Sequence, residues 1–223
     1  MLEEYSGVYR DRWGEEKMVV RNDWTDLHMT LRGVEFVGRD IGGMEPKDKV
    51  ERPELEPFVL NRYPREAAEL CACAIEYEVP VPAVEPGETT VGRLTVRAEL
   101  GQPVGGGMLD HEALRLALTV GGETYQGSGT SDWFEDELLE IQAALPEGIY
   151  MKACINCAFS DYSVYGHGVF GNMLCFRNQK AAYLGVQDKD EYMDIMDGFI
   201  EFVQETYLCP EFERRRPGTG YRG

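Results

Sequence analysis

The sequence contains 223 residues, of which 43% are hydrophobic and 28% are charged. Its formal net charge is −18, because it has 40 Asp and Glu residues and 22 Lys and Arg residues. This balance excludes an intrinsically disordered chain and is typical of a folded globular protein. Because so negative a surface repels phosphate backbones and anionic lipids, we expect no binding to nucleic acid or to membranes. If the protein has a macromolecular partner, its charge favours a basic protein.

The sequence also predicts a compartment. No apolar run approaches the roughly 18 residues that a membrane-spanning helix needs. The first residues, MLEEYSGVYRDRWGEE, have neither the basic start nor the apolar stretch of a secretory signal. We therefore expect a cytoplasmic protein, in which six cysteines would not form a disulfide framework and serve instead as buried thiols or metal ligands.

The N-terminal part predicts strands followed by a long connection. Residues 1–40 alternate apolar and polar side chains in short runs joined by turns, which is typical of a strand meander. Residues 40–66 are rich in Pro, Gly and charge, which predicts a long loop with one short strand at FVLN (58–61).

Four further segments carry apolar side chains at every second position, which places each set on one face of a sheet. These sets are Cys71, Cys73, Ile75, Tyr77 and Val79; Leu94, Val96, Ala98 and Leu100; Leu114, Leu116, Leu118 and Val120; and Leu139, Ile141, Ala143 and Leu145. The last segment continues through a Pro-Glu-Gly turn to Met151 and Ala153. The pattern predicts a mainly β protein with an antiparallel β-sandwich or open barrel.

One helix is expected near the C-terminus, over residues 188–208. Asp188 and Glu191 have the spacing of a capping box, and apolar residues follow at three- and four-residue steps. The chain thus divides into an antiparallel β domain over 1–157 and a segment of loop, helix and tail over 158–223. We expect the second part to pack on the first as one compact unit.

Four cysteines have the spacing of a metal site. Cys154 and Cys157 form a C-x2-C pair, and Cys175 and Cys209 follow singly. Four such thiolates can bind a structural zinc ion with tetrahedral geometry whatever the lengths of the loops between them. His167, in the loop between Cys157 and Cys175, could replace one of them. The alternatives are buried thiols, which is the reading we favour for Cys71 and Cys73, and redox chemistry.

The same loop contains the residue types of a hydrolase. Ser160, Asp161 and His167 could form a catalytic group, with Tyr165 nearby, but no G-x-S-x-G motif accompanies them. Beyond this loop, the tail concentrates Arg214, Arg215, Arg216 and Arg222 after an acidic body. These arginines either bind the protein's own carboxylates, which we favour, or form a flexible handle.

The strings CINCAFSDYSVYGHGVFGNMLCFR (154–177) and QETYLCPEFERRRPGTGYRG (204–223) resemble a family of uncharacterised bacterial proteins, a domain of unknown function. The resemblance implies a bacterial cytosolic protein and no particular activity. We therefore expect a non-enzymatic binding or interaction protein with a structural zinc ion bound by cysteines. An acidic, immunity-type neutraliser of a basic toxin is one concrete form. The alternative is a hydrolase or metalloenzyme that uses the loop at 159–170.

Overall fold

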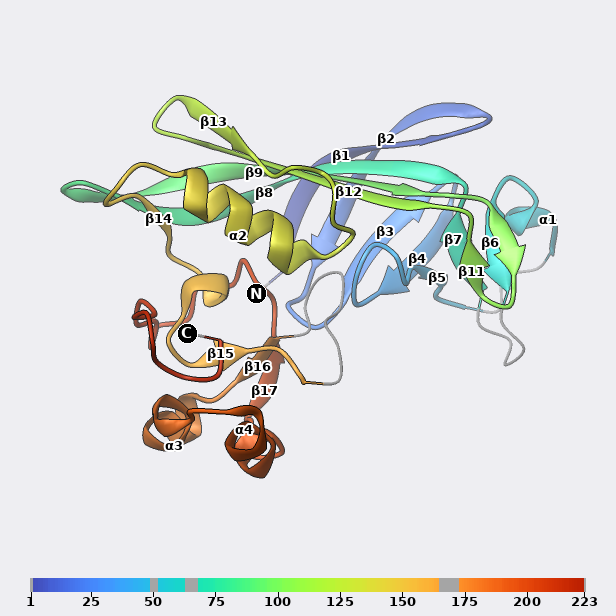
Figure 1. The fold of residues 1–223 in the computed structure, drawn as a ribbon. Helices are drawn as coiled ribbons and strands as arrows, with labels where there is room; N and C mark the ends of the chain where they lie inside the picture. Colours follow the sequence, from blue (N-terminus) through green and yellow to red (C-terminus); the bar gives the residue numbers. More distant parts are fainter. Residues whose placement is uncertain (1, 49–51, 63–67, 165–172, 223) are drawn as a thin grey trace.

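One open antiparallel sheet forms most of the protein (Figure 1). The structure is a computed structural model that describes residues 2–48, 52–62, 68–164 and 173–222. The sheet has ten strands in the order β13-β12-β9-β8-β1-β2-β3-β4-β5, with β14 paired to β8. These strands are β1 (Glu3–Asp11), β2 (Gly14–Asn22), β3 (Leu27–Leu31), β4 (Val34–Gly38), β5 (Glu45–Pro46), β8 (Cys73–Glu85), β9 (Glu88–Leu100), β12 (Glu112–Val120), β13 (Glu123–Gln126) and β14 (Tyr150–Met151).

The expected class, mainly antiparallel β with a helix near the C-terminus, is confirmed, and the sheet is open rather than closed. The alternating sets on β8, β9 and β12 are buried as predicted, with Ile75, Leu94 and Leu118 fully inside. Two small hairpins and a short helix extend the sheet at one end: β6 (Val59–Arg62) with β7 (Ala68–Cys71), β10 (Pro103–Gly105) with β11 (Met108–Leu109), and α1 (Arg52–Leu55). Strand β6 confirms the short strand expected within residues 40–66.

The segment expected as a strand at 139–145 is instead part of a helix, α2 (Phe134–Ala144). Its buried apolar residues follow helical spacing: Phe134, Leu138, Ile141 and then Leu145. Leu139 and Ala143, expected on the buried face, are exposed. The buried side chains of this segment therefore repeat with the helical period of 3.6 residues and not with the strand period of two. Acidic residues in the first turn suit the positive end of the helix dipole.

The C-terminal unit (residues 154–164 and 173–222) lies beyond α2, on the same side of the sheet (Figure 1). A three-stranded antiparallel sheet in the order β15-β16-β17 carries two short helices. Its elements are β15 (Ser160–Asp161), β16 (Met173–Cys175), α3 (Lys180–Gly185), α4 (Lys189–Met196) and β17 (Glu201–Val203), with 3-10 turns η1 (Cys154–Asn156) and η2 (Arg177–Gln179). The largest buried cluster runs from Tyr5 to Ile155, and three smaller ones lie between Cys154 and Val203.

The single helix expected at 188–208 is wrong in its second half. It begins as predicted, because the Asp188 carboxylate accepts a hydrogen bond from the Glu191 backbone (3.0 Å) and caps α4. It ends at Met196, just before Gly198, and the chain then pairs with β16 as β17. Gly198 is a poor helix residue, and Ile200 donates its N–H to the Cys175 carbonyl (2.9 Å). Among the described residues no helix is both long and apolar enough to cross a membrane.

Candidate metal centre

The C-x2-C pair lies on a tight turn directly after the large sheet. Cys154 begins the turn η1, and the Cys157 backbone N–H donates to the Cys154 carbonyl (3.0 Å). Ser160 Oγ donates to the Cys154 carbonyl and lies 3.3 Å from the Cys157 carbonyl. The backbone N–H of Cys154 itself donates to the Tyr207 carbonyl (2.8 Å), two residues before Cys209. The turn is therefore fixed both by its own hydroxyl and by the segment that carries the fourth cysteine.

Cys175 and Cys209 have a similar local geometry. Cys175 ends β16, and Cys209 follows β17 after a turn. In each case the backbone N–H two residues further on is hydrogen bonded to the sulfur: that of Glu211 to Cys209 Sγ (3.2 Å) and that of Arg177 to Cys175. Hydrogen bonds from backbone N–H groups favour the charged form of an acidic group. Each of the two sulfurs thus has a backbone donor, although burial outweighs it at Cys175 and raises the pKa of that thiol.

All four thiols are buried. Each is at most 9% exposed and none forms a disulfide. The pKa of Cys154 is raised far above its ordinary value, first by burial and then by the nearby thiols of Cys157, Cys175 and Cys209. Cys154 and Cys175 share one small buried cluster, and Cys157 lies on the same turn as Cys154. The backbone bond from Cys154 to Tyr207 brings the segment before Cys209 to this turn. By contrast, Cys71 and Cys73 lie in the core of the large sheet.

The four sulfurs fit a metal ion by donor type. Among the described residues, no three Cys, His, Asp or Glu side chains are already arranged to hold a metal ion. An all-sulfur set is the choice of zinc and of iron–sulfur sites, where the metal deprotonates each thiol. The fold supplies the four donors from three separate segments.

Residues 213–215 of the tail pair with the C-x2-C turn. Residue Arg214 pairs with Cys157 in an isolated antiparallel bridge, the Ala158 N–H donates to the Glu213 carbonyl (2.7 Å), and the Arg215 N–H donates to the Asn156 carbonyl (2.8 Å). These bonds hold residues 213–215 of the tail beside residues 156–158. The turn with two cysteines and the tail after the fourth cysteine therefore form one structure.

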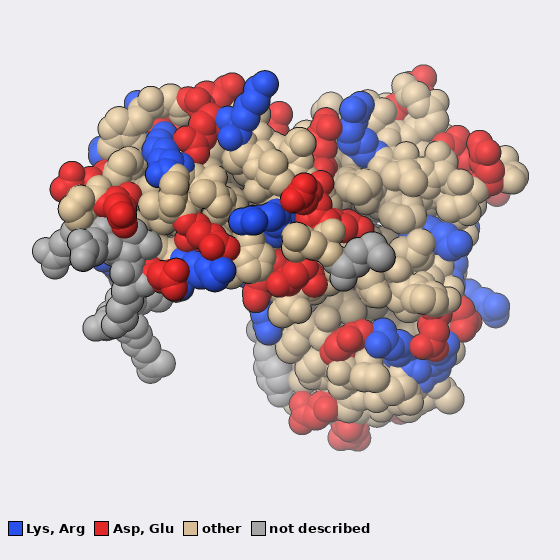
Figure 2. Space-filling model, turned by 180° about the vertical axis from the view of Figure 1, so that it is seen from behind, with Lys and Arg blue, Asp and Glu red and all other residues tan. Residues whose placement is uncertain are grey.

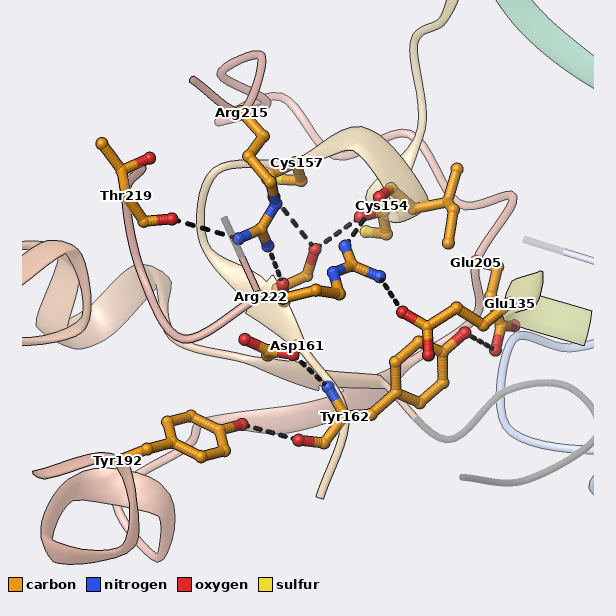
Figure 3. Close-up of polar contacts among 12 residues, drawn as sticks. Glu135, Cys154, Cys157, Asp161, Tyr162, Tyr192, Glu205, Arg215, Thr219 and Arg222 are labelled. Carbon is orange, nitrogen blue, oxygen red and sulfur yellow. Dashed lines mark hydrogen bonds and ion pairs between the residues drawn. The ribbon is translucent and has the colours of Figure 1, made fainter. Parts of the chain in front are cut away.

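The prediction that the tail arginines bind the protein's own carboxylates is confirmed for Arg222. Arg222 forms an ion pair with Glu135 of α2 (2.9 Å) and donates to the Ile155 carbonyl (2.7 Å) (Figure 3). Arg215 binds neutral acceptors instead, namely the Ser160 carbonyl, the Thr219 carbonyl (3.4 Å) and the Tyr183 hydroxyl (2.9 Å).

The hydrolase residues that the structure describes are engaged in the fold. Ser160 is buried and donates to the turn carbonyls. Asp161 is also buried, and its carboxylate accepts from the Tyr162 N–H (2.8 Å) and the Tyr183 hydroxyl (2.6 Å). His167 and Tyr165 lie outside the described residues.

A buried tyrosine–glutamate pair beside the cysteines was not anticipated. Tyr162 donates its hydroxyl to Glu205 (2.7 Å), and its carbonyl accepts from the Tyr192 hydroxyl (2.8 Å) (Figure 3). Glu205 is fully buried, and its carbonyl also accepts from the Ile155 N–H (2.9 Å). Burial and Glu205 raise the pKa of Tyr162 well above its ordinary range. No short motif marks this pair, because its members are 43 residues apart.

The protein thus combines an open antiparallel sheet with a C-terminal unit that contains four buried cysteines. The chain belongs to a family of unknown function (DUF6304), whose model matches residues 3–160. The expected membership in a family of unknown function is confirmed, and the match covers the large sheet, α2 and the C-x2-C turn. Most of the two strings that suggested it lies beyond the matched residues. No curated protein and no solved structure matches the chain.

Proposed function

We propose that the C-terminal unit binds one structural zinc ion through Cys154, Cys157, Cys175 and Cys209, and that the protein is a non-enzymatic cytoplasmic binding protein. The observation that carries the metal proposal is the burial of four thiols on three segments that meet at the C-x2-C turn, with a backbone donor on the sulfur of Cys209. With four protein ligands the coordination sphere is closed, which is the arrangement of structural rather than catalytic zinc.

The ion would join segments of the C-terminal unit that are far apart in the sequence. Cys209 lies 52 residues after Cys157 (209 − 157), and the segment between them contains β15–β17, α3 and α4. A single ion would join the first turn of the unit, its central strand and its tail. Structural zinc contributes about 10–16 kcal/mol of apparent binding energy in small peptides, which is large beside a total stability of roughly 5–15 kcal/mol.

The charge supports a basic protein as partner. Residues 188–197, which include α4, expose Asp188, Asp190, Glu191, Asp194 and Asp197 against Lys189 alone. On the face shown in Figure 2, Asp and Glu side chains are spread over both parts of the molecule with Lys and Arg side chains between them. An immunity-type neutraliser of a basic toxin is one form that such a protein takes. The engagement of Ser160 and Asp161 in structural hydrogen bonds makes a hydrolase the weaker proposal.

Metal content per chain tests the proposal. We expect about one zinc ion per chain in wild-type protein purified without chelator, and its loss in Cys209→Ser. The matched control is Cys71→Ser, because Cys71 is also a buried thiol but lies in the core of the large sheet. We expect that variant to lose stability and keep its metal. A wild-type protein that contains no metal, with all four thiols reduced and slow to react, would contradict the proposal.

A further inference from the structure

A large open cleft lies between the two parts of the molecule. Its volume is about 1010 Å³, and its walls come from α2, β14, the C-x2-C turn, α3 and the tail. Figure 1 shows the tail, in red, between α2 above and α3 below. Ligand sites favour such junctions, and this volume is at the upper end of the range for small-molecule pockets. The cleft is therefore far too large for a single inorganic ion.

The wall formed by the tail is basic although the protein is acidic. All four tail arginines, Arg214, Arg215, Arg216 and Arg222, line the cleft, and among the described residues Glu213 is the one acid that lines it. Glu213 already lies 3.5 Å from Lys180, which also pairs with Glu211 (3.2 Å). The net charge at this wall is thus opposite in sign to the −18 of the whole chain.

Two of these arginines are hydrogen bonded within the fold. Arg222 has its ion pair with Glu135 (2.9 Å). Arg215 contacts the Tyr183 hydroxyl, which in turn donates to the Asp161 carboxylate. These two side chains form the rigid base of the wall. Within the described residues the buried Nε of Arg215 has no acceptor, so even this arginine keeps one donor unused.

The other two arginines, Arg214 and Arg216, are available to bind a ligand. Within the part of the chain that the structure describes, neither Arg214 nor Arg216 has a carboxylate partner, and Arg214 lies over the Tyr150 ring (4.1 Å to its centre). Both are exposed. The backbone at Arg214 is held by an isolated antiparallel bridge to Cys157. Arg214 and Arg216 therefore line one cleft without a carboxylate partner among the described residues.

We propose that this cleft binds an organic di- or triphosphate, with Arg214 and Arg216 as its phosphate ligands. A guanidinium group is planar, permanently charged and suited to bidentate hydrogen bonds with phosphate oxygens. Two such groups lining one cleft can bind more than one phosphate of a phosphate chain. The remaining volume, bordered by Tyr150, Phe159 and Leu184, accommodates the organic part of the ligand. This site goes beyond the proposed metal function and does not require that the metal be present.

Calorimetric titration of the full chain tests the site, with ATP, tripolyphosphate and adenosine as probes in magnesium-free buffer. We expect ATP to bind, tripolyphosphate to compete with it, adenosine not to bind, and the affinity to fall with added salt. If tripolyphosphate binds as tightly as ATP, the phosphate chain alone is recognised; a weaker tripolyphosphate means that the organic part also contributes. Both results support the site.

Arginine variants locate the binding. Each hydrogen-bonded charged contact is worth about 1.5–3 kcal/mol, so each loss should weaken ATP binding roughly tenfold or more. We expect Arg214→Ala/Arg216→Ala to weaken ATP binding about a hundredfold, by the same reasoning. The charge-matched control, Arg10→Ala/Arg93→Ala, changes two arginines of the large sheet that do not line the cleft and should bind ATP almost normally. Circular dichroism verifies that both variants fold.

Three results would overturn the proposal. The first is that neither ATP nor tripolyphosphate binds to the folded wild-type protein at millimolar concentration. The second is that adenosine displaces ATP. The third is an equal loss of affinity in the two double variants, which would show a general effect of charge rather than a site at the tail. Metal content is measured separately on the same preparations, so that failure of this site and failure of the metal proposal are distinguishable.

Discussion

Asn22, at the end of β2, and Gln204, just after β17, form a reciprocal pair of amide hydrogen bonds across 182 residues of sequence. Asn22 Nδ2 donates to Gln204 Oε1 (2.6 Å), and Gln204 Nε2 donates to Asn22 Oδ1 (2.9 Å). Both side chains are almost fully buried. Asn22 also donates to the Tyr5 hydroxyl (2.9 Å) and accepts from the Trp24 N–H (2.8 Å), so its hydrogen-bonding capacity is filled. The pair joins the large sheet to the C-terminal unit.

Loss of this pair should destabilise the whole protein. We expect Asn22→Ala to lower the free energy of unfolding by about 2–4 kcal/mol, because the Gln204 amide and the Trp24 N–H lose partners in a buried site, at about 1–3 kcal/mol each. Urea denaturation measures the change. In a double-mutant cycle with Gln204→Leu, we expect a coupling energy of at least about 1 kcal/mol. Strictly additive effects would show that the two amides do not stabilise each other.

The ion pair between Arg222 and Glu135 gives a second prediction. Its side chains are only 14% and 8% exposed, and it joins the end of the chain to α2. Removing one member of a buried ion pair typically costs about 3–5 kcal/mol, and we expect a loss of that order for Arg222→Ala in urea denaturation. Adding Glu135→Gln should restore part of the loss, because the buried carboxylate is then neutral. A stability unchanged by Arg222→Ala would mean that the tail does not hold α2.

The ion pair between Asp11 and Arg32 predicts a pH dependence. Burial acts to raise the pKa of Asp11, but hydrogen bonds from Arg32 (2.6 and 2.8 Å), the Trp13 N–H and Tyr9 outweigh burial and lower it. A carboxyl whose pKa is lower in the folded state stabilises the fold above its unfolded pKa of about 3.9. That contribution is lost as the pH falls through the folded value.

The variant Asp11→Asn isolates this contribution, because asparagine is neutral at every pH. We expect the variant to be about 1–3 kcal/mol less stable than wild type at pH 6, the worth of hydrogen bonds to a charged group. The difference should shrink below about pH 4, where the aspartate of the wild type becomes protonated. Unfolding in urea between pH 3 and pH 6 gives the comparison. A difference that is constant over this range would contradict the lowered pKa.

The sheet could be predicted from the sequence because its signal is local. Alternation over β8, β9 and β12 identified the buried face of each strand, since side chains repeat every two residues. The same reasoning failed at α2, where Leu139, Ile141, Ala143 and Leu145 satisfy a period of two by coincidence. The true stripe begins earlier, at Phe134 and Leu138. A short apolar segment fits both periods, and only its tertiary contacts decide between them.

The four candidate ligands could be named from the sequence, but not what surrounds them. The C-x2-C spacing is a local signal, whereas Tyr162 meets Glu205 and Arg222 meets Glu135 only because the chain folds back over 43 and 87 residues. The end of α4 was also missed, because continuing apolar spacing concealed a strand after Gly198. Contacts between distant segments depend on the topology of the fold. The spacing of residues within one segment carries no information about that topology.

X-ray absorption at the zinc edge tests the central proposal most directly, since it counts the atoms bound to the metal. For the purified wild-type protein we predict four sulfur ligands at about 2.3 Å, the usual distance for zinc and cysteine. In Cys209→Ser we predict loss of the metal or a sphere with three sulfurs. A wild-type sphere of nitrogen and oxygen ligands without sulfur, or no bound metal at all, would contradict a site formed by Cys154, Cys157, Cys175 and Cys209.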